Sequence, residues 1–314
     1  MTEKKTDEHS SAIKSRSDLP FYTIFIAISA VYVLLIVAML SAETTYTTPD
    51  HIWGAFAKPE IRYAIWLSLV SCAITTVLSL WVSVPIGYLM SRHNFWGKTL
   101  VDAILDIPIV LPPLVIGLCL LILFQVEMPQ IEWVNNILKS VSGALFGKEI
   151  YVAQGDSLDD MIRKMTGLIF SRPIGVTYEI PSVILAQFMV ACAFAVRTMR
   201  VTFDQIGPRY EQVALTLGCN RGQAFWRVVF PQAYRGLLAA GTLAWARSLG
   251  EFGPILVFSG ATRMKTEVLP TTVFLELTVG NIEGAVAASL IMVVSALIVL
   301  VIARMFGLTR GAAI

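Results

Sequence analysis

One basic and one acidic residue stand inside an otherwise apolar stretch of the second half of the sequence. Arg247 and Glu251 are four residues apart, so on a helix they share one face. At membrane depth each such charge costs about 2.5–3.5 kcal/mol on insertion scales. The simplest interpretation is a protein-facing ion pair that offsets these costs. Alternatively, Arg247 faces the path of an anion and Glu251 holds it in place, since a lone glutamate on that path would repel an anion.

Residues suited to catalysis or metal binding are sparse elsewhere. The cysteines have no C-x-x-C spacing and the histidines are scattered singly, so we predict no disulfide framework, catalytic residue or metal site. The phosphate-binding pattern G-x-x-x-x-G-K-[ST] is absent. The segment Gly97-Lys98-Thr99 comes closest to it, but Arg92 stands at the position that requires the first glycine. We therefore expect that the chain is not an enzyme.

Long apolar runs make up most of the 314 residues, of which 56% are hydrophobic and 15% charged. Soluble domains are charged at about 25% of positions, and a net charge of +2 offers little attraction to nucleic acid. A hydrocarbon core about 30 Å thick needs about 20 apolar residues. Six stretches meet or approach that length, which predicts an all-α membrane protein with six transmembrane helices: 21–40, 65–90, 101–124, 180–197, 236–259 and 285–306.

The distribution of lysine and arginine orients these helices. Fourteen basic residues fall on the face that holds both termini and nine on the other, and basic loops stay in the cytoplasm. We expect a plasma-membrane protein with both termini cytoplasmic. Its predicted parts are a cytoplasmic tail (1–20), a transmembrane domain (21–306) that includes an outer insert (125–179) and a cytoplasmic loop (198–235), and a second cytoplasmic tail (307–314).

The outer insert shows two amphipathic stripes, which predict two short helices. The first consists of Ile131, Val134, Leu138, Val141 and Leu145 and would end at Gly147; the second consists of Leu158, Met161, Ile162, Met165, Leu168 and Ile169. Ser157 and Asp160 have the spacing of a capping box before the second helix. The insert is either a lid packed on the membrane surface or on its neighbours, or a docking surface for an external protein.

Residues 207–231 of the cytoplasmic loop predict two short helices joined by a tight turn. Gly207-Pro208 would begin the first helix, Gly218 would adopt the left-handed conformation after it, Asn220 would cap the second, and Pro231 would stop it. Ala214 and Gly218 would permit close approach of a separate motor protein, while Phe225, Trp226 and Val228 would pack on the spans. An ordinary amphipathic loop is the alternative interpretation.

Three prolines interrupt the third predicted span. Pro108, Pro112 and Pro113 remove amide donors, so they should bend or break the helix and expose carbonyls that only protein or a water-lined cavity can satisfy. Such a break suits a moving or pore-lining helix, and a static packed kink is equally compatible with the residues.

The cytoplasmic loop resembles that of a known family. Ala214, Gly218, Val228 and Phe230-Pro231 are similar to the E-A-A, G, I-x-L-P loop of binding-protein-dependent ABC transporter permeases. In that family the loop contacts the ATPase, which implies ATPase-coupling roles for Glu211, Gln212, Ala214, Gly218, Arg221, Val228 and Pro231. The family's glutamate falls on Gln212, and Glu211 is the neighbouring acid, so the charge is displaced by one residue.

Two further segments resemble the molybdate, tungstate and sulfate permeases. They are Arg247-Ser248-Leu249-Gly250-Glu251-Phe252-Gly253 and Asp106-Ile107-Pro108-Ile109-Val110-Leu111-Pro112-Pro113, and Lys265-Thr266-Glu267 looks like a segment of the sulfate members. The resemblance implies a gate or translocation region at Arg247, Gly250, Glu251, Phe252, Gly253, Pro108, Pro112 and Pro113. It spans about residues 60–125 and 180–305 and leaves out the insert.

This resemblance implies a type I ABC importer permease fold and an importer of a tetrahedral oxyanion, with molybdate placed first, then tungstate, then sulfate or thiosulfate. The implied partners are cytoplasmic ATPase subunits that bind ATP and Mg²⁺, an extracytoplasmic substrate-binding protein and a second copy of the chain; no cofactor is expected on this chain itself. The alternative is an ion-coupled secondary carrier. Such a carrier would be expected to show intramembrane acids and often an internal repeat, and Glu251 is the one deep acid that we identify.

Overall fold

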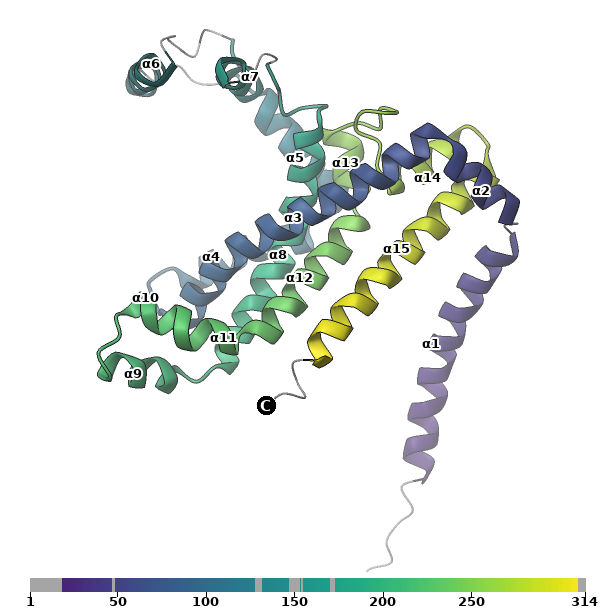
Figure 1. Cartoon of the computed structure of the whole chain (residues 1–314), viewed down its shortest axis with the longest axis horizontal. Coiled ribbons are helices and arrows are strands. Elements are labelled where there is room, and N and C mark those ends of the chain that lie inside the picture. The colour runs from purple at the N-terminus through teal and green to yellow at the C-terminus, as the bar shows by residue number, and fades with distance from the viewer. Residues whose placement is uncertain are drawn as a thin grey trace, which may run out of the picture. The chain divides into compact units, whose positions relative to one another are not determined.

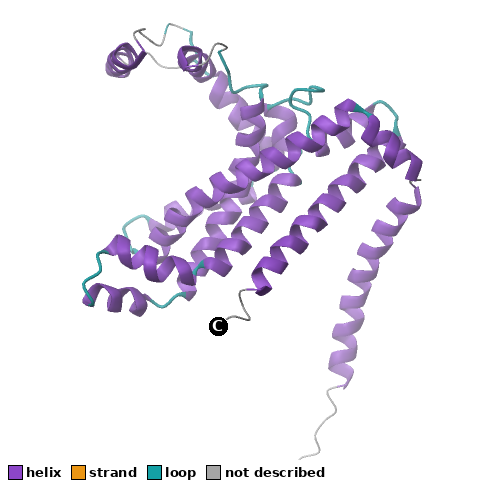
Figure 2. Cartoon of the chain, viewed as in Figure 1, coloured by secondary structure: helices purple, strands orange, loops and turns teal. Residues whose placement is uncertain are grey.

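The computed structural model describes residues 19–46, 49–127, 132–146, 153, 155–169 and 173–309. Within these ranges the chain is helical and contains no strand, apart from one isolated bridge between Glu127 and Ser157. The all-α prediction is therefore confirmed (Figure 2). The chain divides into two compact units, which are described separately below: residues 1–48 and residues 49–314.

The first unit contains helix α1 (Leu19–Tyr46), which covers the first predicted span. Its apolar side chains, among them Phe21, Tyr32 and Leu35, are exposed in the isolated chain. A helix of 28 residues that is apolar on every side has the length and composition of a membrane span. Most of the predicted tail 1–20 lies outside the described residues.

The second unit begins with α2 (Pro49–Ala57) and is built around α3 (Pro59–Arg92) and α8 (Ile180–Gln205), which share its most extensive helix contact. Helices α12 (Tyr234–Leu249) and α15 (Ile282–Thr309) extend this bundle (Figure 1). Small buried residues recur every fourth position along α3, at Ser71, Thr75, Ser79, Ser83 and Gly87. They let the two helix backbones approach closely, as small residues do in membrane interfaces.

The third predicted span is broken, as its prolines predicted. Helix α4 (Lys98–Val110) and helix α5 (Pro113–Gln125) meet at a bend of 110°. The break lies at Leu111 and Pro112, which are extended because each precedes a proline. Pro108 does not contribute to it: this residue lies inside α4, which continues past it for two residues.

The fifth predicted span, 236–259, is also divided. Helix α12 ends at Leu249, and a separate short helix, α13 (Gly253–Phe258), begins two residues after Glu251. Gly250 ends α12, and Pro254 occupies the first turn of α13. Helix α14 (Leu269–Thr278) then leads to α15. In the described part of the chain four helices can span a membrane by length and composition, or five if the α4–α5 pair is one span, so the count of six stays a prediction.

The insert contains α6 (Glu132–Phe146) and α7 (Leu158–Ile169), at the opposite end of this unit from the 207–232 loop (Figure 1). The Ser157–Asp160 capping box forms, because the Asp160 N–H donates to Ser157 Oγ and the Ser157 N–H donates to an Asp160 carboxylate oxygen. Leu158 and Ile162 pack on the bundle, whereas Met165 is exposed. Several other residues of the two predicted amphipathic stripes, and the predicted helix stop, lie outside the residues or side chains that the structure describes. They are Ile131, Val134, Leu138, Val141, Leu145, Gly147, Leu168 and Ile169.

Candidate coupling loop and gate region

The loop after α8 has the turn chemistry that its sequence predicted. Helix α9 (Pro208–Thr216) begins at Pro208, and Gly218 follows it with a φ of +90°. Asn220 then forms a capping box with Gln223 at the start of α10 (Arg221–Ala224). These local predictions are confirmed, since the turn at Gly218 ends α9 and the capping box starts α10.

The predicted role of Pro231 as a helix stop is wrong. A π-helical turn, η1 (Phe225–Val229), follows α10, and the chain continues through the short helix α11 (Phe230–Gln232) into α12. In η1 the Phe230 N–H donates to the carbonyl of Phe225, five residues earlier. The wider turn leaves room for the proline ring, which would otherwise meet the carbonyl of the preceding turn.

Glu211 fixes α9 to the end of α3. Its carboxylate accepts a hydrogen bond of 2.6 Å from the Tyr88 hydroxyl and lies 3.4 Å from Arg92 Nε. Both charged side chains are largely buried, and Arg92 also donates to the Ile206 carbonyl at 2.9 Å. Gln212, by contrast, is exposed. Of the two candidate positions for the family's acid, Glu211 is therefore the one that holds the loop in place.

Aromatic packing adds to this attachment. The Phe225 ring lies 4.8 Å from that of Tyr88 and within the cluster formed by Met199, Phe203 and Val229. The expected packing of Phe225 is confirmed, but Trp226 is exposed and Val228 is half-buried. The buried valine is Val229, which sequence reasoning missed because η1 shifts the helix face that meets the bundle.

The outer surface of the loop is apolar and carries a shallow cavity of about 670 Å³. Ala214 and Val228 line it together with the exposed side chains of Tyr210, Val213 and Leu217. Arg221 lies on the other side of α9, where it lines a cavity of about 600 Å³ together with Arg92 and Glu211. The loop therefore presents a preformed apolar surface while its inner side is held by charged contacts.

Arg247 and Glu251 form the ion pair that their spacing predicted. Arg247 Nη2 lies 2.9 Å from Glu251 Oε1, although Glu251 falls in the break after α12. The Glu251 side chain is 1% exposed, and that of Arg247 is 34% exposed. The Arg247 guanidinium also lies 5.5 Å from the ring centre of Phe194. The pair thus buries its acid and leaves part of its cation at the surface of this unit.

The structure brings the two broken helices together. A Cβ on Gly253 would lie 3.1 Å from the Leu114 backbone nitrogen and 3.2 Å from Pro113 Cβ, so the start of α13 rests on the start of α5. Pro112 forms the N-cap of α5, and the Phe252 ring lies 5.3 Å from that of Phe274. Gly250 is the C-cap of α12. Among the predicted gate residues, Pro108 lies inside α4 and Arg247 lies inside α12, so these two are not part of either helix break.

Sequence reasoning missed a second group of buried acids. Glu276 lies 2.9 Å from Arg263 and 3.9 Å from Lys58, and the Asn281 amide donates to it. Glu267 is fully buried and accepts a hydrogen bond from Thr272. The signal was present in the sequence, since Glu276 interrupts an apolar stretch in the same way as Glu251 does.

Comparison with known proteins matches residues 83–308 to the family described as "Binding-protein-dependent transport system inner membrane component". The chain is 29% identical over 293 residues to the sulfate transport system permease protein CysT of Escherichia coli. This alignment covers 92% of this chain and 93% of that protein. It is also 29% identical over 284 residues to the molybdenum transport system permease protein ModB of Mycobacterium tuberculosis, in an alignment that covers 90% of this chain and 93% of that protein.

A solved structure supports the fold. A bacterial ABC transporter involved in the import of the acidic polysaccharide alginate matches with a TM-score of 0.64 and covers 92% of this chain and 95% of that chain. Its sequence identity is 17%, so the match shows the ABC importer permease fold and nothing about the substrate. The family match covers well over half of the residues. The chain therefore belongs to the family of binding-protein-dependent transport system inner membrane components, as a permease subunit rather than an enzyme.

Proposed function

We propose that this chain is the membrane-spanning subunit of an ATP-driven importer for a tetrahedral oxyanion. The observation that carries the proposal is the α9–α11 loop, whose inner side is fixed by Glu211 and Phe225 and whose outer side is an exposed apolar surface. A rigid, apolar projection of this kind suits a cleft in a separate motor protein. The motor is a separate ATPase, since the sequence contains no G-x-x-x-x-G-K-[ST] segment.

The exposed part of Arg247 supports a second membrane subunit. A guanidinium at membrane depth needs protein or water around it, and about a third of this side chain is uncovered in the single chain. A second copy facing it across the gate would cover it and would place two cations beside the anion path. We therefore propose a homodimer, with Glu251 keeping each Arg247 in place.

The substrate is proposed from the relatives. Sulfate and molybdenum permeases match this chain at the same identity of 29%. We therefore place sulfate level with molybdate as the transported anion, with tungstate as an analogue of the same shape and charge. An extracytoplasmic binding protein would supply the anion, both termini and the α9–α11 loop would face the cytoplasm, and the membrane would be the bacterial inner membrane.

The direct test reconstitutes the permease with its ATPase subunits and binding protein in proteoliposomes. ATP hydrolysis and anion uptake are then measured with sulfate, molybdate, tungstate and, as a control, chloride. We expect one or more of the tetrahedral anions to stimulate both activities and chloride to stimulate neither. Uptake that an ion gradient drives without ATP would overturn the proposal in favour of a secondary carrier.

Glu211→Ala is expected to weaken coupling between this chain and the ATPase. The change removes the carboxylate that holds α9, and a hydrogen bond to a charged group contributes about 1.5–3 kcal/mol. We expect anion uptake in proteoliposomes to fall by about tenfold or more, since a coupling free energy of that size corresponds to such a factor. Gln212→Ala removes an exposed side chain next to Glu211 on the same helix, so it is the matched control and should keep wild-type uptake. Equal losses in the two variants would contradict the role of Glu211.

A further inference from the structure

Helix α7 of the outer insert packs against the helix bundle. Leu158 and Ile162 pack against the buried cluster that contains Leu67, Phe124 and Val183. The capping box between Ser157 and Asp160 fixes the first turn of α7, and Ser157 also pairs with Glu127 just after α5. The helix is therefore attached to the spans by side-chain packing and by its N-terminal turn.

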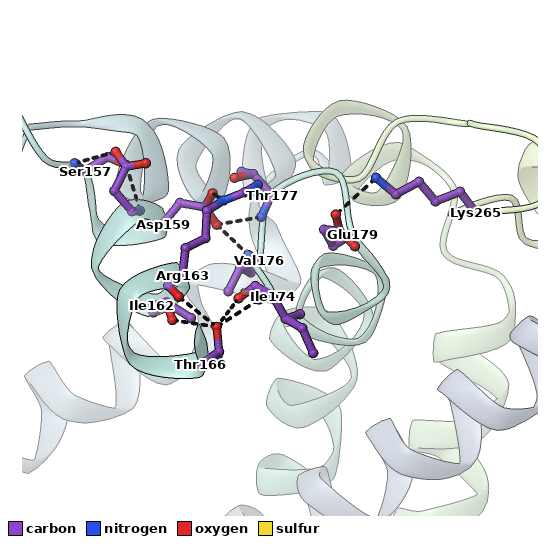
Figure 3. Close-up of polar contacts among 11 residues, drawn as sticks. Ser157, Asp159, Ile162, Arg163, Thr166, Ile174, Val176, Thr177, Glu179 and Lys265 are labelled. Atoms are coloured by element: carbon purple, nitrogen blue, oxygen red, sulfur yellow. Dashed lines mark hydrogen bonds and ion pairs between the residues drawn. The ribbon is translucent and has the colours of Figure 1, made fainter. Parts of the chain in front are cut away.

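Asp159 joins α7 to the segment that leads into α8 (Figure 3). One carboxylate oxygen accepts hydrogen bonds from the backbone N–H groups of Val176 and Thr177, the latter at 3.0 Å, and the other accepts from Arg163 Nε at 2.8 Å. Asp159 is 5% exposed. Burying a carboxylate is costly unless such donors satisfy it, so this contact is specific to one arrangement of α7.

The contact also stays charged at physiological pH. Burial acts to raise the pKa of Asp159, but the hydrogen bonds from Arg163, Val176 and Thr177 outweigh it and hold the pKa below its ordinary value of 3.8. Because the folded-state pKa is lowered, the stabilisation is present above the ordinary value and is lost as the pH falls through the folded-state value. Between pH 5 and 8 the contact is therefore insensitive to pH.

A second hydrogen-bonded contact lies about two turns further along α7, at Thr166 (Figure 3). The Thr166 hydroxyl accepts a hydrogen bond of 2.9 Å from the Ile174 N–H and lies 2.8 Å from the Ile174 carbonyl oxygen. Glu179, the N-cap residue of α8, forms an ion pair of 3.1 Å with Lys265. Residues 174–179 are thus held on both sides.

Helix α8 connects this segment directly to the α9–α11 loop. It runs for 26 residues with no glycine, and its single proline, Pro181, lies in the first turn, where proline is tolerated. At its other end Ile206 receives the Arg92 hydrogen bond, and α9 begins two residues later. One uninterrupted helix therefore links the anchored insert to the loop.

We propose that Asp159 is a positioning residue that makes the outer insert move together with α8, so that engagement of the binding protein outside is transmitted to the α9–α11 loop inside. The inference rests on the proposed function and adds a role for the insert. It differs from a loosely attached lid, whose motion would leave α8 unchanged.

The test compares Asp159→Ala and Asp159→Asn with wild type in the reconstituted complex. ATP hydrolysis is measured against the concentration of the system's own binding protein, with sulfate and molybdate each saturating. We expect Asp159→Ala to keep the basal rate of ATP hydrolysis, because the α9–α11 loop is intact. Its maximal stimulation by the binding protein should be about tenfold smaller than that of wild type. Asparagine retains the oxygen that accepts from Val176 and Thr177, so Asp159→Asn should restore most of that stimulation. Asp160→Asn is the matched control: Asp160 is exposed, and asparagine keeps an oxygen that can accept from the Ser157 N–H, so the capping box stays and the variant should behave as wild type.

Full stimulation of Asp159→Ala would overturn the inference, and so would a parallel fall of basal and stimulated rates, since that result indicates a purely structural role. A wild-type complex that the binding protein does not stimulate would instead count against the proposed function itself. The two failures are therefore distinguishable in one set of measurements.

Discussion

Arg247→Met is expected to destabilise the transmembrane unit by about 3–5 kcal/mol, because it leaves the buried Glu251 carboxylate without its cation. Methionine keeps much of the volume of the arginine side chain, so the loss is one of charge pairing rather than of packing. The measurement is thermal unfolding of the purified permease in detergent, together with the yield of folded protein. Wild-type stability in this variant would show that Glu251 does not depend on Arg247.

Glu251→Gln separates the structural role of this pair from its transport role. Arg247 is partly exposed and lies against Phe194, so it tolerates the loss of its partner better than Glu251 does. We expect a smaller loss of stability than in Arg247→Met, and loss of anion uptake. The double variant Arg247→Met/Glu251→Gln has no unpaired charge and should recover stability without recovering uptake. A double variant that transports at the wild-type rate would show that the pair is structural only.

The features that the sequence predicted correctly are those determined by local chemistry. Gly218 takes a positive φ after α9 and Asn220 caps α10, and neither needs a distant partner. The four-residue spacing of Arg247 and Glu251 predicted a contact on one helix face, and the contact forms even though Glu251 lies just past the end of α12. Hydropathy located the long helices for the same reason, since it measures a property of each segment alone.

The features that sequence reasoning missed depend on tertiary packing. The family's acid aligns with Gln212 and the neighbouring acid is Glu211, but about 100° of helix rotation separates the two positions, so that Glu211 meets Tyr88 while Gln212 is exposed. Pro231 continues the helix because η1 widens the turn before it. Asp159 was not predicted as a site because its partners, Val176 and Thr177, lie 17 and 18 residues away in a loop without a recognisable pattern.

These contacts give α8 a central place in the proposed mechanism. It packs against α3 along the small-residue positions, receives α7 at one end and continues into the α9–α11 loop at the other. Closure of the ATPase would reach α8 through the loop, and the binding protein would reach it through the insert. The spacing between α3 and α8 should therefore affect both stability and coupling.

Gly87→Ala is expected to destabilise this helix pair, contrary to the usual effect of the substitution. Alanine in a helix is favoured over glycine by about 0.5–1 kcal/mol, but a Cβ at Gly87 would lie 2.9 Å from Met199 Cβ and from the Arg200 backbone nitrogen. Backbone atoms cannot move aside as a flexible side chain can, so α3 and α8 must separate. We expect a net loss of about 1–3 kcal/mol for Gly87→Ala, in the range of an overpacked core, and a larger loss for Gly87→Leu.

Gly54→Ala in α2 is the matched control, because a Cβ there would meet nothing within 4 Å, and it should be neutral or slightly stabilising. Thermal unfolding of the three variants in detergent provides the comparison. Gly87 precedes Tyr88, which donates to Glu211, so separation of the helices would also shift the attachment of α9. We therefore expect Gly87→Ala to reduce anion uptake further than its loss of folded protein explains. Equal effects at positions 54 and 87 would contradict close packing of α3 on α8.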